Sequence, residues 1–366
     1  MKNKLWKLRQ CVYGLKDSSR KFYFKVKEIL LEVGCTNSRL DSSIFTYHQD
    51  GLQGILMSHV DDFFWAGTQA FESLAINKIK DVFKISSENS SLFKYLGLDI
   101  QQTQNGVIIN QNKYAKDIEE ILIDPKRLSN INSPLNEAEK TALRSAIGSL
   151  NWLVLQTRPD LAYDVCYLST SLTHGNVSLL CEANRVIKKA KYEEIFLTFP
   201  PMDLENLTLV CYGDASFGNL RDGGSQMGFY MELRSGNLSC PIDWFSKRIR
   251  RCAKSTMAAE TIAMVEALDH AYYTSKLLCQ ILYNDTSRTI PICAVTDNKS
   301  LFQSAKSTTA ITDRRLRIEM AITREYIDEK DVALLWTESQ NQLADCLTKK
   351  GCHNRKLIER ISNFGC

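Results

Sequence analysis

The chain has 366 residues, of which 44% are hydrophobic and 24% are charged. This length suggests two or three domains, and the composition excludes a largely disordered chain. The net charge of +4 is small for this length, so any attraction to nucleic acid must come from local basic runs.

The twelve cysteines are scattered, without a CxxC pair or a histidine at zinc-finger spacing, and the chain does not open on a secretory signal. We therefore expect reduced thiols in an intracellular protein that is not secreted. No window of about 18 consecutive apolar residues occurs, so we expect no membrane span.

Residues 1 to about 130 mix helices with strands. Apolar residues at spacings of three and four predict a helix over 22–33, and another follows over 75–82. Between them, the runs GILMSHV and FFWAG predict a β-hairpin with Asp61 and Asp62 at its tip. The runs LFKYLGLDIQQ and GVIINQ predict a second hairpin around Asn105-Gly106.

The pattern is helical from about residue 134 to 191, and FPPMDLEN is a linker that places a domain boundary near residue 203. Beyond it the sequence predicts three antiparallel strands, a long helix from about Thr256, a buried strand IPICAVTD, further helices, a strand ALLWT and a short helix from about Gln342. This order is typical of a mixed five-stranded sheet with flanking helices. We therefore expect the whole chain to be a two-domain protein of α/β and α+β class.

Four acidic residues fall where this order of elements would bring them together. Asp214 and Asp297 follow two strands at their carboxyl ends, where ligands gather in α/β sheets. Glu260 lies on the apolar stripe of the long helix, and Asp345 opens the last short helix. Three of them have an ordinary alternative: Asp214 as a turn residue, Glu260 as an acid that favours a helix start, and Asp345 as a surface charge.

Crowded carboxylates favour hard divalent cations, so the cluster predicts Mg²⁺ or Mn²⁺. Two such ions can hold the attacking and leaving oxygens of a displacement at phosphorus, which predicts phosphodiester hydrolysis. A basic run near this region is a candidate nucleic-acid contact or else a solvated loop; it comprises Lys247, Arg248, Arg250, Arg251 and Lys254.

Residues 205–352 resemble the ribonuclease H domain of copia-type retrotransposon polyproteins, through YGDASFG, STMAAETIA, AVTDNKSL, DRRLRIEMAITRE and QNQLADCLTKKG. The resemblance implies that Asp214 bridges two metal ions. Asp345 would help to hold the ion that activates water, and Glu260 and Asp297 would hold the other. Asn298 becomes a candidate substrate contact. The mobile histidine that some ribonucleases H place before the last aspartate has no counterpart here.

The earlier half resembles the reverse transcriptase of the same elements, through KLRQCVYGLKDSSRKFY, SHVDDFFWAG, FKYLGLDI and RSAIGSLNWLVLQTRPDLA. Asp61 and Asp62 would be the paired aspartates of the palm hairpin, with His59 where the family has tyrosine. The family's third polymerase aspartate lies upstream of YGLK, and so do its fingers. We therefore expect a polymerase remnant that makes no DNA by itself.

The resemblance divides the chain into a partial reverse transcriptase (1–130), a helical thumb or connection with its linker (131–203), a ribonuclease H domain (204–352) and a tail (353–366). We expect a retrotransposon-derived ribonuclease H that cuts the RNA strand of RNA:DNA hybrids with two Mg²⁺ or Mn²⁺ ions. Expected partners are the hybrid and other polyprotein products, in cytoplasmic virus-like particles or the nucleus.

Two alternatives remain open. The chain could be a non-catalytic fragment that binds nucleic acid or associates with its parental polymerase. A separate chain could also supply the missing polymerase parts and rebuild that site.

Overall fold

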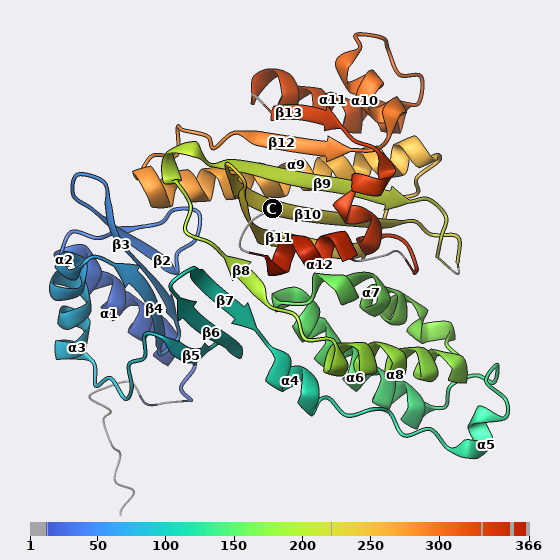
Figure 1. The fold of residues 1–366 in the computed structure, drawn as a ribbon, viewed down its shortest axis with the longest axis horizontal. Coiled ribbons are helices and arrows are strands. Elements are labelled where there is room, and N and C mark those ends of the chain that lie inside the picture. The colour runs from blue at the N-terminus through green and yellow to red at the C-terminus, as the bar shows by residue number, and fades with distance from the viewer. Residues whose placement is uncertain (1–11, 13, 221, 331, 352–354, 364–366) are drawn as a thin grey trace, which may run out of the picture. The chain divides into compact units, whose positions relative to one another are not determined.

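A computed structural model describes residues 12, 14–220, 222–330, 332–351 and 355–363 (Figure 1). The chain divides into two compact units, Met1–Asn89 with Thr274–Thr289, and Ser90–Tyr273 with Ile290–Cys366. The basic opening segment and most of KLRQCVY lie outside the described residues. Within the described ranges, no helix combines the length and apolar character needed to cross a membrane.

The first unit is a four-stranded antiparallel sheet packed against helices. The expected first helix is present, and so is the hairpin with Asp61 and Asp62 at its tip. The core between sheet and helices contains Val26, Phe45 and Phe71, which are fully buried. Its elements are α1 (Ser18–Glu32), β1 (Thr36–Asn37), β2 (Ile44–His48), β3 (Leu52–His59), β4 (Asp62–Gly67), α2 (Gln69–Phe71), a π-helical turn (Glu72–Ile76) and α3 (Asn77–Val82).

The second unit opens with another four-stranded sheet, which contains the expected hairpin around Asn105 and Gly106 and extends it on both sides. The segment expected as one strand is two strands joined at Leu96 and Gly97, which both have positive φ, 47° and 79°. A strand that precedes the predicted linker completes the sheet by pairing with β7. The strands, in the order in which they pair, are β5 (Leu92–Tyr95), β6 (Leu98–Thr103), β7 (Gly106–Asn110) and β8 (Leu197–Phe199).

The segment of chain that connects β7 to β8 is mostly helical, as the sequence predicts. Asn136 and Glu139 cap the start of the longest one reciprocally. After that helix, the guanidinium of Arg158 donates two hydrogen bonds to the Asp160 carboxylate, over 2.8 and 3.0 Å, and both side chains are buried. The elements are α4 (Asn112–Asp117), α5 (Pro125–Leu128), α6 (Glu137–Gln156), α7 (Ala162–Ser171) and α8 (Val177–Tyr192), with short 3₁₀ turns at Pro159–Leu161 and Leu172–His174.

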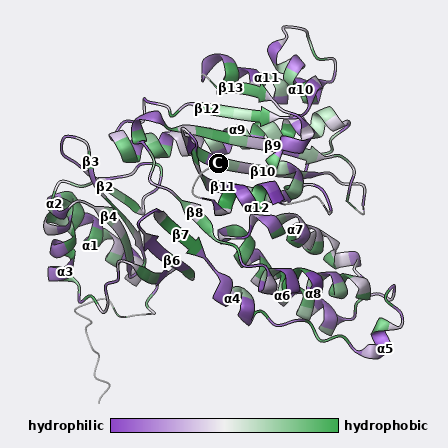
Figure 2. Ribbon diagram, in the orientation of Figure 1, coloured by the Kyte–Doolittle hydropathy of each residue, from purple (hydrophilic) through white to green (hydrophobic). Residues whose placement is uncertain are grey.

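The predicted mixed five-stranded sheet is confirmed. Its order is β11-β10-β9-β12-β13, with β9, β10 and β11 antiparallel, β12 parallel to β9, and β13 parallel to β12. Strand β12, which lies between β9 and β13, is almost wholly apolar, and Figure 2 shows it in the colours of hydrophobic residues. The strands are β9 (Thr208–Ser216), β10 (Gln226–Ser235), β11 (Leu238–Arg248), β12 (Ile292–Thr296) and β13 (Val332–Trp336).

The helices around this sheet follow the predicted order, with one correction. The short helix expected from Gln342 is a 3₁₀ turn, η6, because the backbone N–H groups of Asp345 and Thr348 bond to the carbonyls three residues before them, Gln342 and Asp345. The helices are α9 (Thr256–Tyr283), α10 (Lys299–Lys306), α11 (Arg314–Glu329) and α12 (Arg355–Ser362), with 3₁₀ turns at Leu204–Asn206, η5 (Ser339–Asn341) and η6 (Leu343–Leu347). Helix α12 lies in the segment expected as a tail, and its Leu357 and Ile361 are buried in the core.

Candidate metal centre

Asp214 and Asp297 come from neighbouring parallel strands. β9 carries Asp214, and β12 ends one residue before Asp297. Because the two strands run in the same direction, these residues meet at the same edge of the sheet. Asp214 is 1% exposed, so its carboxylate is almost fully withdrawn from water.

Glu260 reaches this edge from the first turns of α9. Ala259 and Ala263 of the helix belong to a buried cluster with Ala215 of β9. At Gly213 a Cβ atom would stand 3.3 Å from the Ala263 carbonyl oxygen, so a side chain there would push the helix away. The glycine before Asp214 therefore lets α9 approach the sheet closely and bring Glu260 to it.

Asp214, Glu260 and Asp297 form a compact acidic triad. One carboxylate oxygen from each lies within 4.8 Å of the other two. Within the described part of the chain, Asp214 Oδ1 and Glu260 Oε2 are buried without a hydrogen-bond partner. Unpartnered buried acceptors are costly, and hard oxygen donors in this number suit a divalent cation. The triad fits a divalent metal ion.

Asp345 lies beside Asp214 and outside this triad. Its turn, η6, packs on the sheet face that carries Val210 and Tyr212, which is the Asp214 face because side chains alternate along a strand. The Lys349 ammonium joins the two acids, 2.5 Å from Asp345 Oδ1 and 3.8 Å from Asp214 Oδ1. We refer to Asp214, Glu260, Asp297 and Asp345 together as the candidate metal centre.

Asp214, Glu260 and Asp345 resist ionisation. Burial, followed by the neighbouring Asp345 carboxylate, raises the pKa of Asp214 to about 7, although Lys349 opposes the rise. Burial, with the charges of Asp214 and Asp297, raises the pKa of Glu260 to about 9. Burial also raises the pKa of Asp345. A divalent ion would reverse these shifts, because it stabilises the ionised carboxylates.

Several residues that support these acids were not identified from the sequence. Trp336 Nε1 donates to the Asp297 carbonyl over 3.0 Å, and Ser339 Oγ donates to Asp297 Oδ2 over 2.6 Å. The Thr348 hydroxyl donates to Asp214 Oδ2. Among these supporting residues, only Lys349 could have been identified from the sequence, because it follows Asp345 by four residues. Lys349 comes from a different segment than Glu260, and its charge acts on Glu260.

The other predicted site residues are not members of this triad. The Asn298 side chain caps α10 by accepting a hydrogen bond from the Leu301 N–H over 2.9 Å. Asp61 and Asp62 are exposed at the tip of the β3–β4 hairpin, with Val60 at a positive φ of 53°. Among the described residues, no group of three potential metal ligands includes either aspartate.

The basic run at the end of β11 is largely neutralised by acids. Lys247 lies 2.7 Å from Glu266, and Lys254 lies 3.6 Å from Asp313. Two arginines of the run are also paired, Arg248 with Asp222 and Arg251 with Glu319. The run is therefore less cationic than its sequence suggests.

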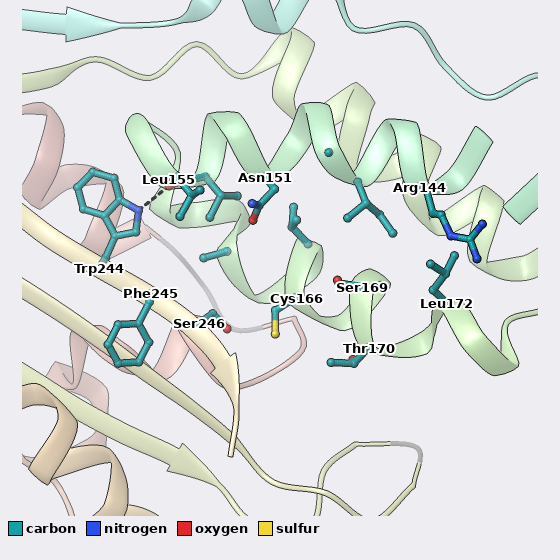
Figure 3. Close-up of a pocket in the computed structure, with 15 residues that line it drawn as sticks. Arg144, Asn151, Leu155, Cys166, Ser169, Thr170, Leu172, Trp244, Phe245 and Ser246 are labelled. Atoms are coloured by element: carbon teal, nitrogen blue, oxygen red, sulfur yellow. Dashed lines mark hydrogen bonds between the residues drawn. The ribbon is translucent and has the colours of Figure 1, made fainter. Parts of the chain in front are cut away.

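A cavity of about 420 Å³ lies between α6, α7 and β11 (Figure 3). Asn151, Cys166 and Ser169 line it, and Arg144 stands at one end. The Trp244 indole beside it donates to the Val154 carbonyl over 2.6 Å. None of the four acids of the candidate metal centre lines this cavity.

Comparisons with known proteins agree with this architecture. Residues 1–132 match the family described as reverse transcriptase (RNA-dependent DNA polymerase). The chain is 24% identical to the retrovirus-related Pol polyproteins of the Arabidopsis thaliana transposons RE1, over 95% of its length, and RE2, over 94%. It spans about a quarter of the length of these relatives, 24% in each case.

One solved structure resembles most of the chain. It is a foamy viral protease-reverse transcriptase in complex with an RNA/DNA hybrid, with a TM-score of 0.50 and 13% identity, over 90% of this chain and 39% of that one. At this identity the likeness concerns the fold alone. The chain has a reverse transcriptase-like part and a ribonuclease H-like part, the latter built on the five-stranded sheet.

The chain is thus similar to reverse transcriptases in sequence over residues 1–132 and similar in fold to a solved reverse transcriptase over most of its length. In sequence it is also similar to the Pol polyproteins of copia-type retrotransposons.

Proposed function

We propose that the ribonuclease H-like part of this chain hydrolyses the RNA strand of RNA:DNA hybrids by two-metal-ion catalysis. The observation that carries the proposal is the triad of Asp214, Glu260 and Asp297, in which buried carboxylate oxygens have no hydrogen-bond partner among the described residues. Such oxygens bind hard cations, and a metal pair is suited to a displacement at phosphorus.

Each acid has a separate role in this proposal. Asp214 is central because it belongs to the triad and also shares the Lys349 ammonium with Asp345, so it would be shared between two ions. Glu260 and Asp297 would hold one ion, and Asp345 would hold the other. When bound, Mg²⁺ or Mn²⁺ supplies an activated water and neutralises charge on the phosphate. Ser339 and Trp336 fix Asp297, and Thr348 fixes Asp214, so the ligands are oriented before substrate arrives.

The proposed substrate is an RNA:DNA hybrid, in keeping with the hybrid bound by the structurally similar foamy viral enzyme. Other products of a Pol polyprotein are proposed partners, and virus-like particles or the nucleus are the proposed places of action. The proposal does not depend on the reverse transcriptase-like residues 1–132. Asp61 and Asp62 in that region are exposed, and we assign no DNA synthesis to them.

The test uses the full chain with a hybrid whose RNA strand is end-labelled. We expect cleavage of that strand with Mg²⁺ or Mn²⁺, none with chelator, and none of the labelled RNA alone. Asp214→Asn should abolish cleavage, whereas Asp285→Asn, a change at a partly exposed position whose side chain is 39% exposed, should not affect it.

Binding of the hybrid is measured in parallel, with and without magnesium. Salt-sensitive binding without any cleavage would overturn the proposal in favour of a non-catalytic nucleic-acid-binding protein.

A further inference from the structure

Lys349 places a positive charge inside the candidate metal centre. Its backbone N–H donates to the Asp345 carbonyl over 3.0 Å, and its side chain turns back toward the same residue. The ammonium lies 2.5 Å from Asp345 Oδ1 and 3.8 Å from Asp214 Oδ1. Lys349 is therefore held at the Asp214–Asp345 side of the centre by its own turn.

The two sides of the centre differ in what occupies them. On the triad side, Glu260 Oε2 has no hydrogen-bond partner within the described residues, and none of their basic side chains forms an ion pair with Glu260 or Asp297. On the other side, the Lys349 ammonium contacts both acids. A divalent ion bound between Asp214 and Asp345 would need the same oxygens and would repel the ammonium, so the two cations exclude one another.

We propose that Lys349 is an internal counter-ion that holds the Asp214–Asp345 side until a metal ion displaces it. This inference rests on the proposed function, because it concerns the second of the two ions. Metal binding then occurs in order. The first divalent ion binds the triad with Lys349 in place, and the second binds only when the ammonium leaves Asp345.

The adjacent lysine offers a matched control. Lys350 lies 2.6 Å from Glu182, and its ammonium stands 5.3 Å from the centre of the Tyr167 ring. It contacts none of the four acids of the candidate metal centre in the described structure. The two lysines thus have the same charge and almost the same place in the sequence, but only Lys349 reaches the centre.

The test is a calorimetric titration of the full chain with Mn²⁺, without nucleic acid. In Lys349→Met we expect the Kd of the second ion to fall by on the order of tenfold, because a competing cation is removed. The Kd of the first ion should change by much less. Lys350→Met should bind both ions like the parent, and Lys349→Arg, which keeps the charge, should remain close to the parent.

The parent protein gives an independent measurement if Lys349→Met does not fold. The side-chain ¹⁵N resonance of Lys349 should show a protected ammonium through the first equivalent of Mg²⁺, and should lose that protection with the second.

The inference would be overturned if Lys349→Met bound the second Mn²⁺ ion no more tightly than the parent, or if the first equivalent of Mg²⁺ already released the ammonium. The proposed function would still stand in either case, provided that the parent cuts the hybrid. A parent that binds no Mn²⁺ would overturn both.

Discussion

Gly228 of β10 pairs directly with Asp214 of β9 in the antiparallel ladder. The space that a side chain at Gly228 would fill is taken by η6, since its Cβ would stand 2.6 Å from Leu347 Cβ. The same turn carries Asp345. The missing side chain opposite Asp214 therefore allows the fourth acid to approach the first.

Replacing this glycine should displace η6. We expect Gly228→Ala to lower the free energy of unfolding by about 1–3 kcal/mol through overpacking. It should also weaken Mn²⁺ binding, because Asp345 moves with the turn. Urea denaturation and a Mn²⁺ titration would measure the two effects.

Gly148, an exposed position in α6 with no atom near its would-be Cβ, provides the control. Gly148→Ala should stabilise the protein by up to about 1 kcal/mol through helix propensity. A Gly228→Ala protein as stable as the parent would contradict the packing that we describe.

Ser339 should act as a positioning residue for Asp297, since its hydroxyl donates to Asp297 Oδ2 over 2.6 Å. We expect Ser339→Ala to weaken metal binding and hybrid cleavage by about tenfold, as loss of a supporting hydrogen bond to a ligand does elsewhere. The loss should fall on kcat and leave KM for the hybrid nearly unchanged. Ser339→Thr keeps a hydroxyl and should recover most of the activity.

Ser287 provides the matched control, because its hydroxyl donates to Asp285 over the same 2.6 Å on the exposed surface. Ser287→Ala should behave like the parent in both assays. Equal losses in the two variants would show that Ser339 has no specific role.

The pH dependence of stability should invert when metal is added. Folding raises the pKa of Asp214 to about 7 and that of Glu260 to about 9, mainly by burial, from unfolded values near 4. The metal-free native state therefore keeps protons that the unfolded chain has released. Stability is full below about pH 4 and is lost as pH rises through about 7 and about 9.

Urea denaturation in chelator should accordingly give midpoints that fall between about pH 5 and about pH 9. Millimolar Mg²⁺ should remove or reverse this fall, because the ion stabilises the ionised acids. Glu260→Gln, which does not titrate, should reduce the slope. Midpoints that rise with pH in chelator would be incompatible with the buried acids that we describe.

Arg158 should be a strong determinant of stability in the helical region. Its guanidinium is buried, pairs with the buried Asp160 and donates to the Ala190 carbonyl over 3.1 Å. Arg158→Met leaves the Asp160 charge without this partner, so we expect a loss of about 3–5 kcal/mol. Arg185→Met removes an exposed pair with Asp164 and should cost at most about 1 kcal/mol. Thermal or urea denaturation of the two variants should show this contrast.

The sequence predicted the later half of the fold because its elements have clear periodicity. The buried run of β12 predicted a strand covered on both faces, and the apolar stripe of α9 predicted a helix packed on the sheet. Together these two predictions placed Asp214, Glu260 and Asp297 close to one another, as the structure has them. The turn at Leu96 was missed, because nothing in the sequence signals a leucine at positive φ. Strand β8 was also missed, since its partner β7 lies far away along the chain.

The supporting residues of the candidate metal centre were harder to predict. Ser339 and Trp336 contact Asp297 only through the tertiary fold, and neither has a periodic or motif signal. Lys349 could have been found from its spacing of four residues after Asp345, which lets a side chain return to the preceding turn. Whether Asn298 contacts substrate stays a prediction, and its capping role already explains its residue type.

The most direct test of the central claim, that these acids form a nuclease centre, compares the parent with Asp297→Asn on an RNA:DNA hybrid in Mg²⁺. The substitution is nearly isosteric and leaves a group that can still contact Ser339, so the fold should persist. We predict that the parent cuts the RNA strand and that the variant loses at least about a hundredfold in rate. A variant that cuts as fast as the parent would contradict the claim.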